Sequence, residues 1–158
     1  MSIERVRGYL KAFGLAEAVL EFPVSSATVT LAAEAAGVIP ARIAKSLSFM
    51  LPDGPILVVT AGDMKINNAG FKARFHAKAK MLTRDEAAEL IGHAVGGVCP
   101  FALNEGVRVY LDESLRRFET VFPACGSDNS AIELSPDRLA EVAQNFCGWV
   151  DVCKPIEA

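Results

Sequence analysis

The sequence contains no run of about 18 uncharged apolar residues, so no segment of it is expected to span a membrane. Its first residues pass directly into an amphipathic pattern and lack the apolar core of a signal peptide. Only four of the 158 residues are cysteines, and no two of them form a Cys-x-x-Cys pair. These absences argue against a disulfide scaffold and a zinc site. We therefore expect a cytoplasmic protein with reduced thiols that uses neither a metal nor a cofactor.

The signatures of the common hydrolases are missing as well. No Gly-x-Ser-x-Gly, His-Glu-x-x-His or P-loop motif occurs. The two histidines, His76 and His93, are expected to be surface or structural residues rather than a catalytic base. No histidine stands near Cys125 in the sequence, and intracellular thiols are commonly inert core residues. A thiol enzyme that uses Cys125 or Cys99 stays open as an alternative.

Length and composition favour one ordinary globular domain. A chain of 158 residues can bury one sizeable core, so residues 1–158 are assigned to a single domain. Hydrophobic residues make up 51% of the chain and charged residues 22%, which is usual for a globular protein. Hairpin signals are mixed with helix signals along the chain. This order predicts an α/β fold of the α+β type rather than a doubly wound parallel sheet.

The spacing of apolar residues predicts the individual elements. Thr28 or Thr30 is expected to cap a short helix, Thr83 has the spacing of a capping box, and Ser135 precedes a proline at a helix start. The expected helices cover residues 3–13, 28–36, 65–74, 84–92 and 135–146. The expected strands cover residues 18–22, 42–50, 56–60, 80–82, 107–111, 119–124, 131–134 and 149–152.

Charge is unevenly distributed along the chain. The formal net charge of −3 argues against a protein that binds nucleic acid over its whole surface. Between Asp63 and Asp85, however, there is no acidic residue. A local basic strip can bind phosphates on an acidic protein, and the alternative is a solvated helix face. The basic residues of this stretch are Lys65, Lys72, Arg74, Lys78, Lys80 and Arg84.

Lys45 is the most informative single position. Side chains alternate between the two faces of a strand, so Lys45 should share a face with Ile43, Leu47 and Phe49. An ammonium on such an apolar face needs an acceptor, a ligand anion or water. It is therefore a candidate for holding a phosphate or a carboxylate, or for polarising a carbonyl. The alternative is a lysine near the strand end whose side chain reaches water.

Two glycine-bearing loops are the other candidate features. In Val95-Gly96-Gly97-Val98-Cys99-Pro100-Phe101, two adjacent glycines permit positive φ and close approach of the backbone to a ligand. Backbone N–H groups in such a loop can stabilise a developing oxyanion. The segment from Ala124 to Ser130 carries small and polar residues that suit a pocket mouth. The alternative for both segments is an ordinary turn.

Taken in order, these segments resemble the YbaK-like family of editing domains, which also occur inserted in or associated with prolyl-tRNA synthetases. The resemblance covers residues 24–149. It is carried by Thr28-Val29-x-x-Ala32-Ala33, Gly37-Val38-x-Pro40, Ile43-Ala44-Lys45-Ser46-Leu47, the loop 95–101, and Gly126-x-x-Asn129-Ser130-Ala131-Ile132-Glu133-Leu134-Ser135-Pro136. It implies a compact α/β fold with a mixed, curved sheet flanked by helices.

The resemblance also implies an activity, which is hydrolysis of the ester that joins a mischarged small amino acid, such as alanine or cysteine, to tRNA. Proline tRNA is the expected carrier and prolyl-tRNA synthetase an expected partner. Lys45 is expected to contact the tRNA end at a phosphate, and the backbone of Gly96 and Gly97 to approach the ribose and the scissile carbonyl. The other residues expected to bind substrate are Thr28, Pro100, Gly126 and Asn129. The basic residues expected to bind tRNA are Lys65, Lys72, Arg74, Lys78 and Lys80.

The chain departs from some family members at three places. Ala131 stands where some members have an acidic residue, Ala124 stands where others have serine, and the late loop has no histidine. Asn129 is then the polar residue left in that loop to bind substrate. These departures keep open a second interpretation, a non-catalytic module on the same fold that binds a nucleotide, a tRNA end or a protein.

Overall fold

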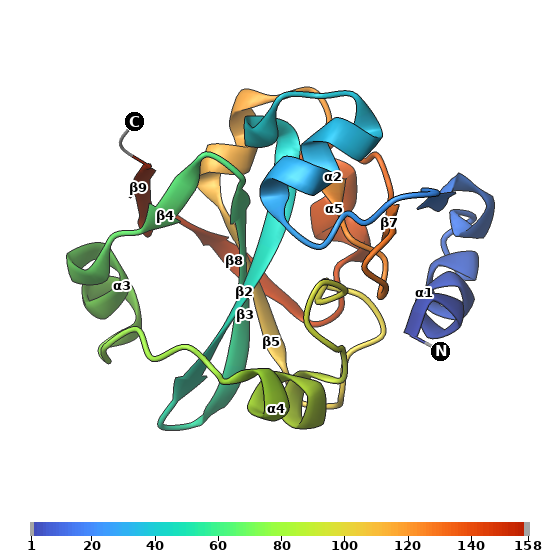
Figure 1. The fold of residues 1–158 in the computed structure, drawn as a ribbon. Coiled ribbons are helices and arrows are strands. Elements are labelled where there is room, and N and C mark those ends of the chain that lie inside the picture. The colour runs from blue at the N-terminus through green and yellow to red at the C-terminus, as the bar shows by residue number, and fades with distance from the viewer. Residues whose placement is uncertain (1, 157–158) are drawn as a thin grey trace.

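The computed structural model describes residues 2–156 and is built around a five-stranded mixed sheet (Figure 1). The strand order is β6 (Phe122–Pro123), β2 (Ile43–Leu51), β3 (Gly54–Ala61), β5 (Arg108–Asp112) and β8 (Phe146–Val150). β2 and β3 form an antiparallel hairpin, and the other neighbouring strands are parallel. Two short pairs lie outside this sheet, β1 (Leu20–Glu21) with β7 (Ser130–Ala131) and β4 (Met64–Ile66) with β9 (Cys153–Pro155). The mixed sheet expected from the family resemblance is confirmed.

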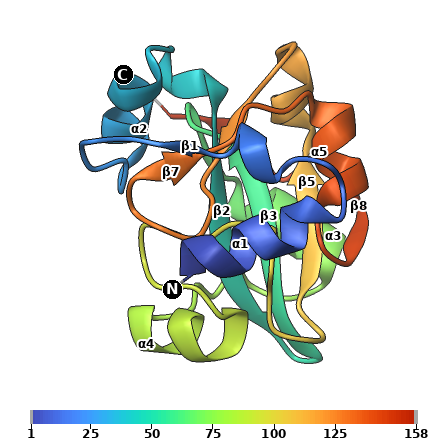
Figure 2. The same ribbon diagram turned by 90° about the vertical axis from the view of Figure 1, so that its right-hand side faces the viewer.

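Helices cover both faces of the sheet. In Figure 1, α3 lies on one side of it, and α1 and α5 lie on the other; Figure 2 shows α1 in front of the sheet from that second side. No helix in residues 2–156 is both long and apolar enough to cross a bilayer. The helices are α1 (Ser2–Lys11), α2 (Val29–Ala36), α3 (Asn68–Phe75), α4 (Arg84–Glu86) and α5 (Pro136–Val142). Shorter helical turns are η1 (Ala16–Ala18), η2 (Pro40–Arg42), the π-helical η3 (Ala87–Ile91) that continues α4, and η4 (Glu113–Arg117).

Each face of the sheet has its own apolar core. On one face, Val6 and Leu10 of α1 and Leu139 of α5 pack with Leu57 and Val59 of β3. On the opposite face, α3 buries Phe71 against residues that include Phe49, Ile56 and Tyr110. Because β3 is covered on both sides, it forms a nearly continuous apolar run from Ile56 to Val59.

Local sequence signals placed several helix starts correctly. Thr83 and Glu86 form the expected capping box, and the Ser135 side chain accepts a hydrogen bond from the N–H of Arg138. The third helix was predicted too early, because Lys65 lies in β4. The Asn67 side chain caps that helix by accepting a hydrogen bond from the N–H of Gly70, so the helix begins at Asn68.

Strand predictions near the sheet edges need correction. Residues 80–82 form only a single bridge, between Met81 and Phe49. The segments 119–124 and 131–134 meet through the Val121–Leu134 bridge and a hydrogen bond from the Ile132 N–H to the Pro123 carbonyl. As strands, however, β6 pairs with β2 and β7 pairs with β1. The strand expected at 149–152 begins earlier, as β8, and a further short strand, β9, follows it. These pairings join distant segments, so a local pattern does not specify them.

The cap of α2 gives a first prediction. The Thr28 side chain accepts a hydrogen bond from the N–H of Leu31, whereas Thr30 lies exposed inside the helix. Thr28→Ala should lower the free energy of unfolding by about 1 kcal/mol, because it removes the cap. Thr30→Ala should leave that free energy unchanged or raise it by a few tenths of a kcal/mol, since alanine is the better helix former. Urea unfolding measures both, and an equal loss in the two variants would contradict the assignment of the cap.

Candidate active site

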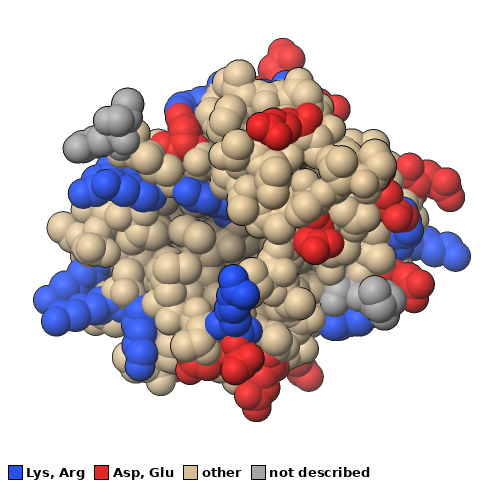
Figure 3. Space-filling model, in the orientation of Figure 1, with Lys and Arg blue, Asp and Glu red and all other residues tan. Residues whose placement is uncertain are grey.

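A cleft of about 320 Å³ opens on the face of the molecule that is seen in Figure 1. Figure 3 shows this face hollowed near its centre, between α2 and α4. Most of the wall residues are small or apolar, and no acidic residue within the described part of the chain lines the cleft. The lining includes Ser26, Ala27, Thr28, Val29, Ile43, Ala44, Lys45, Ser46, Ser48, Arg84, Ala87, Val95, Gly96, Val98, Ala124, Ser130 and Ala131.

The cleft exists because one edge of β2 is only partly covered. β6 pairs with β2 at Ile43 and Ala44, and further along β2 the segment around Met81 bridges Phe49. Between these two contacts, the stretch from Lys45 to Leu47 has no strand neighbour on that side among the described residues. The floor of the cleft is therefore a short open length of strand edge, and side chains from both faces of β2 reach its rim.

Lys45 lies on the face that its position in the strand predicts. Its cross-strand partner is Thr60, and Leu47 and Phe49 of the same face pack in the smaller core. The side chain is half-buried, and its ammonium donates a hydrogen bond to the carbonyl of Met64 in β4. Burial lowers the pKa of Lys45, while the nearby Cys153 and Asp63 raise it. The amine is thus held on a backbone acceptor at the wall of the cleft.

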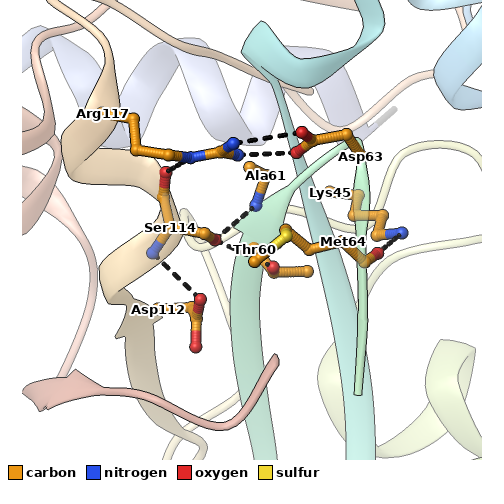
Figure 4. A network of polar contacts seen from close by, with 8 residues as sticks. All are labelled: Lys45, Thr60, Ala61, Asp63, Met64, Asp112, Ser114 and Arg117. Atoms are coloured by element: carbon orange, nitrogen blue, oxygen red, sulfur yellow. Dashed lines mark hydrogen bonds and ion pairs between the residues drawn. The ribbon is translucent and has the colours of Figure 1, made fainter. Parts of the chain in front are cut away.

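A polar network fixes the turn that carries this acceptor (Figure 4). The Arg117 guanidinium binds both carboxylate oxygens of Asp63, at 2.6 and 3.1 Å, and its Nε donates to the carbonyl of Ser114 at 2.8 Å. The Ser114 hydroxyl in turn accepts from the N–H of Ala61 at 3.2 Å. The hydrogen bond from Arg117 keeps the pKa of Asp63 below its usual value. The turn between β3 and β4 is therefore tied to η4, and sequence reasoning missed this tie because its partners are 54 positions apart.

The two glycines of the loop 95–101 have different roles in the structure. Gly96 lines the cleft with a φ of +91°, and a Cβ added there would lie 3.3 Å from the Cβ of Ala27. Gly97 is not among the lining residues. A Cβ on Gly97 would lie 2.5 Å from the carbonyl carbon of Gly126, so the two loops meet backbone to backbone. Gly96 therefore faces the cleft, and Gly97 and Gly126 hold the wall behind it together.

The remaining residues predicted to bind substrate are divided between the cleft and its supports. Thr28 lines the cleft while it caps α2. Pro100 and Asn129 are absent from the lining. The Pro100 carbonyl accepts from the N–H of Gln144 at 2.9 Å, and the Asn129 amide donates to the carbonyl of Phe22 at 3.2 Å. The structure thus brings Thr28, Lys45 and Gly96 together and places Pro100 and Asn129 outside the lining.

The predicted basic strip lies beside the cleft rather than in it. Its members Lys65, Lys72, Arg74, Lys78 and Lys80 are all exposed, on β4, on α3 and in the segment that follows α3. In Figure 3, Lys and Arg side chains gather on the left of this face, where α3 lies in Figure 1. Arg84 of the same stretch lines the cleft itself. Basic side chains are therefore present both on the surface of α3 and in the lining of the cleft.

The thiols are poorly placed to act as nucleophiles. Cys99 and Cys125 are fully buried and do not line the cleft. Burial raises the pKa of Cys99 to about 12 and raises that of Cys125 as well. A nitrogen of the His93 ring lies 3.6 Å from the Cys99 sulfur. Burial lowers the pKa of this histidine, in contrast to the thiols, whose pKa values it raises. An inaccessible, protonated thiol is unreactive, so the geometry argues against the thiol-enzyme alternative.

Comparisons with known proteins identify a matching family and similar folds. A family model described as "Aminoacyl-tRNA editing domain" matches residues 24–142. YwhH of Bacillus subtilis (strain 168), an uncharacterized protein, is 52% identical over 158 residues, which cover 99% of this chain and 100% of YwhH. Proline–tRNA ligase of the same strain is 30% identical over 102 residues, which cover 63% of this chain and 18% of the ligase. The solved structure of a proposed trans-editing enzyme for prolyl tRNA synthetase matches with a TM-score of 0.87 at 29% identity, covering 97% of each chain.

The backbone contact of Gly97 gives a second prediction. Gly97→Ala should lower the free energy of unfolding by about 1–3 kcal/mol, because the new methyl group overlaps the backbone of Gly126. Gly8→Ala is the matched control, since Gly8 lies in α1 with nothing within 4 Å of an added Cβ. In that control, the free energy of unfolding should rise by about 0.5–1 kcal/mol. Urea unfolding compares the two, and a neutral Gly97→Ala would show that the loops are not in close contact.

Proposed function

The chain belongs to the aminoacyl-tRNA editing domain family, and on this premise we propose that it is a free-standing deacylase that acts in trans on mischarged tRNA. In the proposed reaction, water adds to the ester carbonyl and the bond to the ribose oxygen of the terminal adenosine breaks. The products are a free amino acid and a tRNA with its ribose hydroxyl restored. The proposed substrates carry a small residue of the alanine or cysteine type, on proline tRNA. Charged tRNA as substrate implies a cytoplasmic location.

The observation that carries the proposal is the Lys45 ammonium at the wall of a cleft that contains no carboxylate among the described residues. A half-buried cation held only by a backbone carbonyl is suited to an anionic ligand, and a tRNA end brings phosphates. In the proposed complex, Lys45 binds a phosphate next to the terminal ribose. That contact fixes the ester relative to the cleft.

The proposed chemistry relies on positioning rather than on a side-chain base. An aminoacyl ester is already activated, so orientation and stabilisation of the developing oxyanion supply much of the rate. Gly96 is the glycine whose backbone faces the cleft, and it is the proposed contact to the ribose and carbonyl. Gly97 contributes by holding that backbone against the late loop. No histidine or carboxylate of residues 2–156 lines the cleft to act instead.

Selection of a small residue is proposed to be steric. Ala27, Ala44 and Ala124 are among the residues whose side chains bound this cleft of about 320 Å³. A hydrophobic pocket distinguishes one methylene by only about 1–3 kcal/mol, so the correctly attached, bulkier proline has to be excluded by collision with the walls. The walls come from the α2 entry segment, from β2 and from the residue after β6.

A non-catalytic binding module is the second candidate. Ala131, which stands where some family members have an acidic residue, lines the cleft. A cleft with cations and no general base also suits simple capture of a nucleotide or tRNA end. The two candidates differ in turnover, which the lysine experiment below measures together with binding. Prolyl-tRNA synthetase is the proposed protein partner of either form, by its similarity to this chain.

Lys45 gives the third prediction. Lys45→Ala should lower kcat/KM for deacylation of mischarged proline tRNA by at least about 100-fold, or about 2.7 kcal/mol in activation free energy, because the phosphate loses its partner. Lys11→Ala in α1, an exposed lysine that does not line the cleft, is the control and should keep full activity. Circular dichroism checks that both variants fold. Full activity of the Lys45→Ala protein would contradict the proposed role of this lysine. If the unchanged protein binds tRNA but does not hydrolyse the ester, the result favours the binding module.

The basic strip gives the fourth prediction. Each phosphate contact that is lost should reduce the slope of log affinity against log salt by about 0.7–0.9. Lys72→Ala with Lys78→Ala should therefore weaken tRNA binding and flatten its salt dependence, and should leave hydrolysis of a short aminoacyl-oligonucleotide unchanged. Lys11→Ala again serves as the control. If the double variant has the same salt slope as the unchanged protein, α3 and the segment after it do not contact tRNA.

A further inference from the structure

Two hydroxyls buried in the wall of the cleft lack hydrogen-bond partners. Within residues 2–156, three buried side-chain polar atoms are unpaired: Ser26 Oγ, Ser46 Oγ and His93 Nδ1. Ser26 and Ser46 both line the cleft, and the Ser26 residue is 8% exposed. The two serines come from segments 20 positions apart, the entry to α2 and the open edge of β2. The fold therefore brings both serines to the same cleft.

A buried hydroxyl without a partner opposes folding, because it has left water and gained nothing in return. Native proteins satisfy the large majority of such groups. Two unpaired hydroxyls that line one cleft indicate a ligand that forms hydrogen bonds with them. A serine hydroxyl can turn about a single bond, so a group that enters the cleft can draw it into a hydrogen bond.

Four other polar side chains of the cleft show what that ligand must offer. Thr28 Oγ1 is engaged by the N–H of Leu31, and Ser130 Oγ is engaged by Ser127 at 2.7 Å. Lys45 and Arg84 can only donate hydrogen bonds. With no carboxylate in the described lining, a ligand group that donates hydrogen bonds must use neutral oxygen acceptors. Ser26 and Ser46 provide two that are buried and free.

An aminoacyl ester carries one such donor next to its carbonyl, the α-amino group. We propose that Ser26 and Ser46 form the subsite that binds the α-amino group of the substrate. This inference rests on the proposed function, because it takes the ligand to be an aminoacyl ester. Both serines are sequence neighbours of residues near the proposed contacts. Ser26 precedes Ala27, whose Cβ lies 3.3 Å from the position of a Cβ built on Gly96, and Ser46 follows Lys45 in β2 with its side chain on the other face of the strand.

The subsite has a consequence for substrate choice. An acylated amine has one N–H and a bulky carbonyl substituent, so it fits two buried hydroxyls poorly. The cleft should therefore spare tRNAs whose amino acid is already blocked, such as peptidyl-tRNA. Selection against them would come from Ser26 and Ser46, and selection for a small side chain from the alanine walls.

Binding of two uncleavable analogues tests the inference. In both, an amide replaces the ester at the 3′ position of adenosine; one carries alanyl and the other carries propionyl, which is alanyl without its amino group. The unchanged protein should bind the alanyl analogue at least tenfold tighter than the propionyl analogue, as measured by calorimetry. Ser26→Ala and Ser46→Ala should each reduce this ratio below threefold, mainly by weakening the alanyl analogue. Thr30→Ala is the control, because this hydroxyl is exposed on α2 and does not line the cleft, and it should keep the ratio.

Stability of the unliganded variants supplies an independent readout. Removing an unpaired hydroxyl should leave the urea midpoint unchanged or raise it, whereas removing a structural hydrogen bond would lower it. A lowered midpoint for Ser26→Ala and Ser46→Ala would overturn the inference. The inference would also be overturned if the two variants left the ratio of affinities for the alanyl and propionyl analogues unchanged. An equal loss of affinity for both analogues would overturn it as well.

Failure of the proposed function gives a different result. If the protein discriminates between the analogues through Ser26 and Ser46 but releases no amino acid from alanyl- or cysteinyl-tRNA, the subsite stands and the deacylase proposal falls. If it hydrolyses these tRNAs while the variants bind both analogues as the unchanged protein does, the deacylase proposal stands and the subsite falls. Binding of neither analogue by the unchanged protein would overturn the subsite.

Discussion

The site depends on the hydrogen bond from the Lys45 ammonium to the Met64 carbonyl. A lysine on the apolar face of a strand is costly unless its charge finds an acceptor, and here the acceptor belongs to the main chain of another strand. Because a carbonyl is neutral, the positive charge is held in place without being cancelled, and it remains available to an anion. The bidentate Asp63–Arg117 pair then matters indirectly, since it fixes the turn from which Met64 extends.

Main-chain geometry, rather than a set of reactive side chains, gives the cleft its character. An interrupted edge of β2 forms the floor, and the loop 95–101 meets the late loop through Gly97 and Gly126. Such a frame orients a bound ester through contacts that need no titratable group. The proposed ester hydrolysis therefore needs neither a catalytic triad nor metal ligands, and the sequence contains no motif for either.

The sequence predicted what depends on neighbours along the chain. Alternation placed Lys45 on its face, and capping signals placed the starts of α4 and α5. It did not separate Gly96 from Gly97, because their roles differ only through the approach of Gly126, 29 positions away. The same holds for the Asp63–Arg117 pair and for the edge pairings of β6 and β7. The catalytic and tRNA-binding roles assigned to these residues remain predictions that the experiments address.

The contact between Gly97 and Gly126 restricts how such a domain can acquire a new substrate preference. Two loops that meet through their main chains leave no room for a side chain, so this part of the wall offers little scope for mutational variation. Three alanines, Ala27, Ala44 and Ala124, line the cleft instead. Substitutions at Ala27, Ala44 or Ala124 can reshape the cleft while the backbone frame stays as it is. Libraries designed to retarget the domain to other amino acids should therefore vary these alanines and leave both glycines untouched.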